Sequence, residues 1–457
     1  MTRTSLALTL LFFFNIAGGV KAQDTWSLEK CITYALENNL QVKQQNLAVE
    51  TKENALTVAK MAHLPTFNAS ASHSYSFGRA IDSGNNQVSK DISSTNFSVN
   101  ANVTLFNGFE ILNTKKQSQT DYMAAKYNVE TTKNSIAIQI ALGYLQILFN
   151  DELVNSTATQ VELSKMQVER TRVLVNAGSL PEGNLFEMEA QLASDEAQLV
   201  NAQNQLDLAY LTLTQMLDLK SAESFRIEKP TNVDIEEKLA ATNPQEIYNI
   251  SMGIMPQIKG SELNVESANY GLKIAKGRYY PQLTLGASYG SVAQQYLKEQ
   301  PVIPDPTDPT VNLNEEVPFD VQIKNNASTY VGLNLSIPIF NGLQTRKGVS
   351  NAKINLSSSQ IDLENQKNSL YKDIQQAYAD ALAALKKYKS TQKSLQALEE
   401  AFRYSEQKFN LGMVTSIDYT TAKNKLAKAQ TDLLQAKYEF IFKSKILDFY
   451  KGETLKL

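Results

Sequence analysis

The side chains best suited to metal binding or acid–base chemistry are few in this 457-residue chain. There are two histidines, His63 and His73, and a single cysteine, Cys31. Neither histidine has a cysteine or histidine partner at the spacing of a metal site, and no phosphate loop, nucleophile elbow or zinc-protease motif occurs. The sequence therefore predicts no enzyme, no cofactor and no metal site.

The carboxylates are numerous but scattered among lysines and glutamines. Glu399 and Glu400, for example, have Lys393 nearby and Arg403 following. A solvated helix surface explains this pattern, and no paired acid–base site is indicated. The formal net charge of −3 offers no basic surface to nucleic acid, which we do not expect as a partner.

Four segments alternate strictly between apolar and uncharged polar side chains. They are Thr66–Phe77, Asn96–Phe106, and residues from about 282 to 290 and from about 329 to 339. In the second segment the apolar face is predicted to run through every other residue from Phe97 to Leu105. Such strands are typical of a transmembrane β-barrel, with lipid on one side and water on the other, although a soluble sandwich strand would look similar alone.

Four strands are too few to close a barrel, because even small single-chain barrels use about eight. An open sheet edge cannot persist in lipid, where unpaired backbone groups have no water to bond. We therefore expect several chains to combine their strands.

The N-terminal segment predicts export from the cytoplasm. Residues 1–22 contain a basic Arg3, an apolar stretch from Leu6 to Ile16 and a cleavage signal ending at Ala22. No later apolar run reaches the roughly 18 to 20 residues of a membrane-spanning helix. We expect a mature chain that begins at Gln23 and leaves the cytoplasm without an inner-membrane anchor.

The chain reads as a duplication. Phe106-Asn107-Gly108 recurs as Phe340-Asn341-Gly342, an offset of 234 residues (340 − 106 = 234), and the same offset relates Gly178 to Gly412. The predicted organisation is a first repeat over 23–220, a connector over 221–243, a second repeat over 244–450 and a tail over 451–457. Each repeat reads helix, strand, loop, strand, helix.

The predicted helices are unusually long. Leu343 to Leu411 contains no proline, and as one helix or two stacked helices it would reach about 100 Å. Leucines recur at heptad spacing at Leu185, Leu192, Leu199, Leu206 and Leu213. Narrow apolar rows favour helices packed side by side as coiled coils, either in a ring around polar space or as an ordinary soluble coiled coil.

Taken together, the sequence resembles the TolC family of outer-membrane efflux proteins over essentially the whole mature chain. The resemblance rests on the opening WSLEKCITYALENNLQVKQQ, on the junctions LPTFNASASHSYS, YPQLTLGASYG, LFNG and IFNG, and on the paired tips NAGSLPEGNL and NLGMVTSIDY. It implies a mainly α fold with membrane β-structure. In a homotrimer, four strands per chain would close a 12-stranded barrel, continued by a long coiled-coil α-helical barrel.

The function implied by this resemblance is the outer-membrane exit channel of a tripartite efflux or type I secretion system. Such a passive, gated duct meets a periplasmic adaptor and, through it, an inner-membrane pump. Two alternatives remain open, a periplasmic coiled-coil scaffold and a free-standing porin. The cargo and the pump are not indicated by the sequence.

The resemblance also implies two sets of site residues. The adaptor-contact tips centre on Gly178 and Gly412, with Ala177 and Leu411 beside them, and the same glycines would serve as helix turns. Asp418 stands at a family gate position, where three copies would attract cations and repel one another. Its alternative role is a solvated carboxylate at a helix start.

Other gate positions depart from the family pattern. Phe409 replaces a tyrosine, Val414 an arginine, and Thr421 and Asn184 each replace an aspartate. The closing contacts must therefore differ in detail from those of the family.

Overall fold

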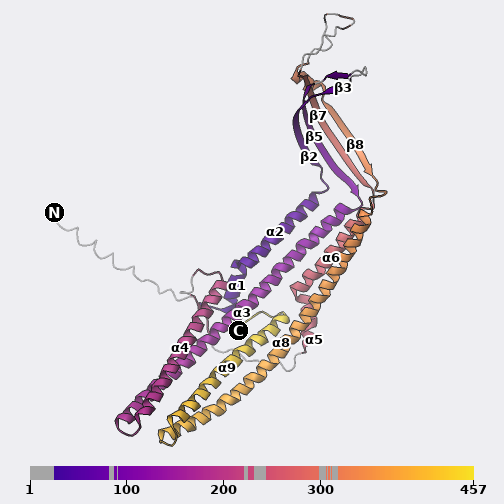
Figure 1. The fold of residues 1–457 in the computed structure, drawn as a ribbon. Coiled ribbons are helices and arrows are strands. Elements are labelled where there is room, and N and C mark those ends of the chain that lie inside the picture. The colour runs from indigo at the N-terminus through magenta and orange to yellow at the C-terminus, as the bar shows by residue number, and fades with distance from the viewer. Residues whose placement is uncertain are drawn as a thin grey trace, which may run out of the picture. The chain divides into compact units, whose positions relative to one another are not determined.

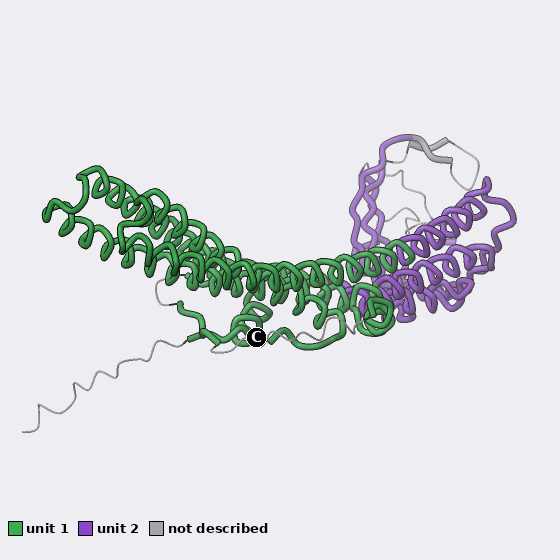
Figure 2. The backbone as a smooth tube through the Cα atoms, turned by 90° about the horizontal axis from the view of Figure 1, so that it is seen from below, with its two compact units in different colours: residues 1–48, 126–260, 364–457 green, residues 49–125, 261–363 purple. Residues whose placement is uncertain are grey.

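A computed structural model describes residues 25–81, 87–89, 91–220, 225–230, 243–297, 305, 307–308, 310 and 317–456. The predicted signal peptide, most of the connector and much of the second inter-strand loop lie outside the described residues. The chain divides into two compact units, coloured separately in Figure 2. One comprises residues 1–48, 126–260 and 364–457, and the other comprises residues 49–125 and 261–363.

A four-stranded antiparallel sheet with the order β2-β5-β7-β8 lies in the second of these units (Figure 1). Its strands are β2 (Thr66–Ser76), β5 (Ile92–Asn107), β7 (Gln282–Tyr296) and β8 (Ser328–Ser336). All four predicted strands are present, but β5 begins earlier and β7 ends later than expected. The predicted end of β8 near residue 339 is wrong, because Pro338 has no N–H to donate to a ladder.

In the central part of the sheet, the strand register places apolar residues opposite apolar residues. Ala69 pairs with Val99, Val99 with Tyr289, and on the next ladder Leu285 pairs with Leu333. A bulge at Leu105 makes Phe106 the partner of Leu283. The extra residue in one strand shifts the alternation that the sequence predicts to continue through Leu105.

Short elements add to this plan. The predicted loop between the first two strands contains β3 (Arg79–Ile81) and β4 (Gln87–Ser89), which pair with each other. β1 (Thr25–Trp26) pairs in parallel with β6 (Arg226–Ile227). The helix α7 (Phe319–Asn325) precedes β8.

Helices form most of the rest of the described chain. The first predicted helix is divided at Asn39 into α1 (Leu28–Asn38) and α2 (Leu40–Met61), because the Asn39 side chain accepts the Gln41 N–H at 2.8 Å. Their counterparts in the second half are α5 (Pro244–Ile254) and α6 (Pro256–Gly277). Within the described ranges, no helix combines the length and apolar content of a membrane span.

Two helical hairpins repeat one design. α3 (Glu110–Asn176) and α8 (Gln344–Asn410) each have 67 residues, and α4 (Glu182–Met216) and α9 (Ser416–Tyr450) each have 35. Each helix of the second hairpin begins 234 residues after its counterpart. In the first unit α5, α8 and α9 bury a shared apolar core that includes Ile247, Ile374 and Phe440.

Candidate functional site

The two hairpin tips have the same backbone geometry. Gly178 and Gly412 both have φ of +71°, and an added Cβ would meet no atom within 4 Å at either position. The N–H of Ser179 donates to Leu174 O at 2.8 Å, and the N–H of Met413 donates to Lys408 O at 2.8 Å. These are the bonds of a glycine-terminated helix end, so the left-handed backbone alone requires glycine here.

Large apolar side chains project into solvent around the tips. Leu411 is 75% exposed, Met413 72%, Ile417 63% and Phe186 60%. Ala177 is exposed as well. Exposed apolar groups at the end of otherwise polar helices are suited to contact with another protein.

Asp418 forms a capping box at the start of α9. The Thr415 hydroxyl donates to Asp418 Oδ2 at 2.7 Å, and the Asp418 N–H donates to Thr415 Oγ1 at 3.1 Å. These hydrogen bonds from Thr415 lower the pKa of the Asp418 carboxyl below its usual value. The carboxylate is exposed, and its predicted helix-start role is therefore present in the single chain.

The other predicted gate residues have separate surroundings. The Phe409 ring stacks on Tyr419 with centroids 4.8 Å apart, and burial raises the pKa of Tyr419 to about 12. Asn184 lies in the first turn of α4, while Val414 is half-buried and Thr421 is exposed. Among the described hydrogen bonds, none joins Asp418 to any of these residues.

A buried polar cluster, which the sequence analysis missed, connects α3, α4 and α9. The Lys423 ammonium contacts Asp195 Oδ2 at 2.7 Å, with only 7% and 3% of the two side chains exposed. Ser164 of α3 bonds to both groups, and Gln191 donates to Asp195 Oδ1 at 2.7 Å. The positions of Asp195 and Lys423 could have indicated this cluster. Both lie within the leucine heptads of their helices, where solvated charges are not expected.

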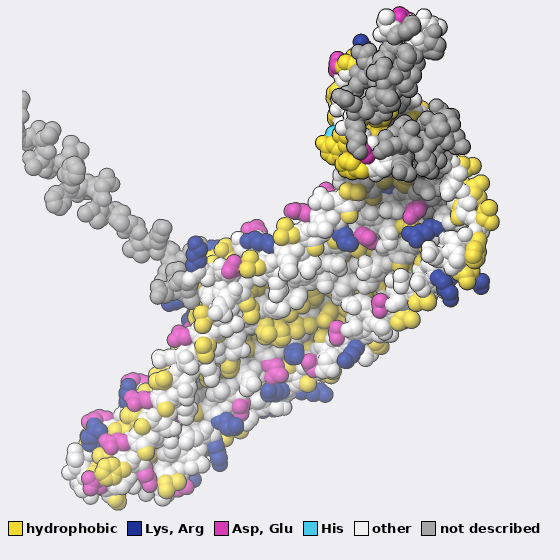
Figure 3. All heavy atoms as spheres, turned by 45° about the horizontal axis from the view of Figure 1, so that its top comes forward, with side chains coloured by type: hydrophobic (Ala, Val, Ile, Leu, Met, Phe, Trp, Pro, Cys, Tyr) yellow, Lys and Arg dark blue, Asp and Glu magenta, His cyan; other side chains and the backbone are white. Residues whose placement is uncertain are grey.

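The sheet presents an exposed apolar face. Phe67, Val331 and Leu333 are 70%, 67% and 66% exposed. Figure 3 shows apolar side chains in yellow on the visible part of the strands, whereas blue and magenta charged groups are distributed along the helices. A face of this kind is unfavourable in water and matches the lipid-facing side of a membrane strand.

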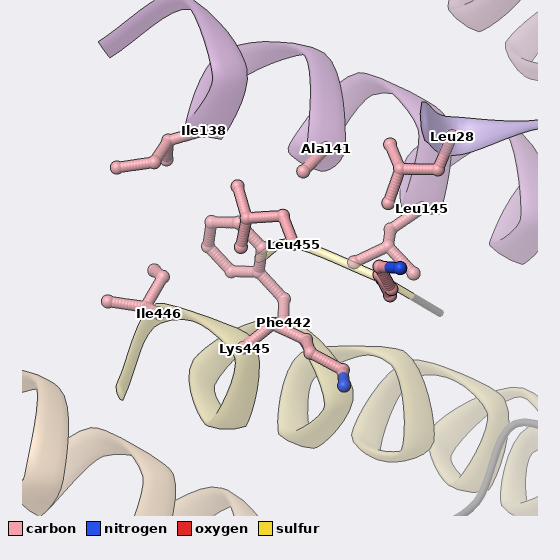
Figure 4. Close-up of a pocket in the computed structure, with 9 residues that line it drawn as sticks. Leu28, Ile138, Ala141, Leu145, Phe442, Lys445, Ile446 and Leu455 are labelled. Carbon is pink, nitrogen blue, oxygen red and sulfur yellow. The ribbon is translucent and has the colours of Figure 1, made fainter. Parts of the chain in front are cut away.

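A small apolar pocket lies in the first unit, among Leu28, Ile138, Ala141, Leu145, Phe442 and Leu455 (Figure 4). Leu455 projects into it from the C-terminal stretch, and Lys456 forms an ion pair with Glu29 at 2.8 Å. The free space of about 10 Å³ admits no more than a single water molecule. Across the described residues, no three His, Cys, Asp or Glu side chains gather to hold a metal ion.

Comparison with known proteins gives a consistent result. A model of the family described as "Outer membrane efflux protein" matches residues 31–218 and 254–448. The chain is 21% identical to toxin and drug export protein A of Aggregatibacter actinomycetemcomitans, covering 91% of this chain and 83% of that protein. It is 20% identical to outer membrane protein TolC of Escherichia coli, covering 95% and 84%.

Solved structures share the fold. The outer membrane protein VceC of Vibrio cholerae matches with a TM-score of 0.76 and 15% identity, covering 93% of this chain and 96% of that one. The Campylobacter jejuni CmeC outer membrane channel matches with a TM-score of 0.75 and 18% identity, covering 94% and 86%. The predicted fold class, mainly helical with four membrane strands per chain, is confirmed.

Proposed function

The chain belongs to the outer membrane efflux protein family, and from this premise we propose that it is the outer-membrane exit channel of a tripartite efflux or type I secretion system. The observation that carries the proposal is the open four-stranded sheet with an exposed apolar face, on a chain whose other elements are long helical hairpins. The channel is a passive duct and catalyses no reaction. Its residues 1–22 are removed during export.

Closure of the sheet requires other copies of the chain. Among the described strands, β2 and β8 each pair on one side only, and unpaired backbone groups are costly in lipid. Three copies would supply twelve strands, which is enough to close a barrel. The apolar face then contacts outer-membrane lipid and the Asn- and Ser-rich face lines a wet lumen.

The hairpin tips are the proposed contact with a periplasmic adaptor, which joins the channel to an inner-membrane pump. The exposed apolar side chains Leu411, Met413, Ile417 and Phe186 support this role, together with the sharp turns at Gly178 and Gly412. The aperture at this end is proposed to close around Asp418. Its capping role and a gate role are compatible, because Thr415 contacts only one of the two carboxylate oxygens.

The first experiment measures mass and outline of the mature protein in detergent by light scattering and negative-stain microscopy. A threefold particle longer than about 100 Å, the reach expected from helix rise, agrees with the proposal. A monomer that is stable without detergent would contradict it and favour a soluble scaffold. Unchanged export of every tested drug or toxin after deletion of the gene would count against an exit duct.

Conductance in planar bilayers separates a gated duct from a free-standing porin. We expect small or intermittent currents from the wild type and larger currents from Asp418→Ala, because three mutually repelling carboxylates and their bound cations are removed from the aperture. Glu399→Ala, which removes an exposed carboxylate of α8 outside the predicted gate positions, is the matched control. Steady open currents from the wild type would indicate a porin.

A further inference from the structure

The buried cluster around Lys423 shows how one repeat docks on the other within a chain. α9 lies against both helices of the first hairpin (Figure 1), where Lys423 occupies a groove formed by Gln160 and Ser164 of α3 and Asp195 of α4. Lys437 extends the contact by pairing with Glu152 at 3.0 Å. The groove of the first repeat is therefore filled by a basic side chain of the second.

The second repeat has the same groove without this occupant. It lies between Thr391, Ser394 and Leu398 of α8 and Lys425, Lys428 and Ala429 of α9, with Asp432 at one end. By the repeat offset of 234 residues, Ser394, Leu398 and Ala429 are equivalent to Gln160, Ser164 and Asp195. These three residues surround Lys423. The open groove is thus the repeat equivalent of the filled one.

The matching occupant is identified by the same offset. Position 423 corresponds to Glu189 of α4, and Glu182 and Glu196 lie seven residues on either side of it. Arg172 donates to Oε1 of Glu189 at 3.1 Å and leaves Oε2 without a bond among the described contacts. The Glu189 side chain is 41% exposed, so a large part of it is available to a partner.

Compared with the first repeat, the groove of the second repeat and its proposed occupant both carry the opposite charge. Where the first groove has Asp195, Gln191 and Ser194, the second has Ala429, Lys425 and Lys428. Neither lysine forms an ion pair in the described part of the chain. A lysine enters an acidic groove within the chain, and a glutamate would enter a basic groove between chains.

We propose that Glu189 of a second copy of this chain occupies the α8–α9 groove beside Lys425 and Lys428, so that each junction between copies repeats the internal junction with reversed charge. This inference rests on the proposed assembly of several copies. The net charges of the two complete hairpins support this inference. Residues 151–216 carry ten acidic and three basic side chains, a net charge of −7, whereas residues 385–450 carry seven and twelve, a net charge of +5.

The test is oxidative crosslinking of Glu189→Cys combined with Ser394→Cys, the pair equivalent to Lys423 and Gln160. Covalent dimers and trimers on a denaturing gel are expected, because the proposal places these two positions opposite each other at the junction between copies. Cys31 does not compete, since it is buried and burial raises the pKa of its thiol to about 12. Glu162→Cys with Ser394→Cys is the matched control, because Glu162 is exposed on the α3 face opposite Gln160.

The outcomes separate this inference from the proposed function. If the wild type has the mass of a trimer but the Glu189→Cys, Ser394→Cys variant crosslinks no more than the control variant, the inference is overturned and the channel proposal remains intact. A wild type that is monomeric by mass overturns both. A second measurement uses charge, since Glu189→Lys should reduce the trimer fraction and the added pair Lys425→Glu and Lys428→Glu should restore it. Failure of this rescue, with folded protein present, also overturns the inference.

Discussion

At the scale of single residues, the Lys423–Asp195 pair is the strongest constraint between α4 and α9. A buried charge whose partner is removed costs about 3–5 kcal/mol, because neither water nor a counter-charge replaces the lost contact. We expect Asp195→Ala to lower the free energy of unfolding by about this amount, measured by denaturant titration of the detergent-solubilised protein.

Two variants control for this effect. Lys387→Ala breaks the exposed pair with Glu439 and should cost less than about 1 kcal/mol, because exposed pairs are solvated. Asp195→Leu combined with Lys423→Met removes both charges and should recover most of the loss. Equal destabilisation by Asp195→Ala and by the double variant would show that shape, and not charge, governs this site.

Asp418 gives a pH-dependent prediction. Its folded-state pKa lies below the usual 3.8, so its stabilisation of the α9 terminus is present above that value and is lost as the pH falls through the folded pKa. Asp418→Ala should therefore accelerate hydrogen exchange in residues 416–420 near neutral pH, and the difference from wild type should disappear in acid. A difference that persists well below the usual pKa would contradict the capping role.

At the scale of elements, the hairpin tips depend on backbone conformation. Gly412→Ala should destabilise the hairpin by about 1–2 kcal/mol, because a Cβ is unfavourable at a φ of +71° even where no neighbour obstructs it. Gly348→Ala, inside α8 with no neighbour within 4 Å, should instead stabilise the protein by about 0.5–1 kcal/mol. Thermal unfolding of the two purified variants checks these opposite signs, and the same sign for both would count against this account.

At the scale of the whole molecule, the orientation of the sheet decides which substitutions the membrane tolerates. Leu333 belongs to the apolar face and Asn334 to the polar face of β8. Leu333→Lys should cost about 2–4 kcal/mol and reduce the folded protein in the outer membrane, whereas Asn334→Lys should be tolerated in a wet lumen. Equal amounts of both variants in the outer-membrane fraction would contradict lipid contact on the Leu333 face.

The helices, the strands and their duplication can be predicted from the amino-acid pattern alone. Strict alternation predicts the four strands, because a strand directs successive side chains to opposite faces. Long proline-free stretches predict α3 and α8. The equivalent glycines Gly178 and Gly412 predict the turns, since left-handed backbone favours glycine. The need for several chains to close the sheet follows from the sequence as well, because it depends only on the number of strands per chain.

The side-chain contacts between the two hairpins depend on how the helices pack and cannot be predicted from the amino-acid pattern. Lys423 and Asp195 are 228 residues apart, and heptad periodicity does not specify which of two equivalent helices α9 contacts. The bulge at Leu105 likewise depends on how β5 pairs with β7, which the alternation of side chains along β5 does not encode. Periodicity fixes the face that a helix buries, whereas the identity of the partner depends on how whole helices pack, and this packing placed an acidic groove in one repeat and a basic groove in the other.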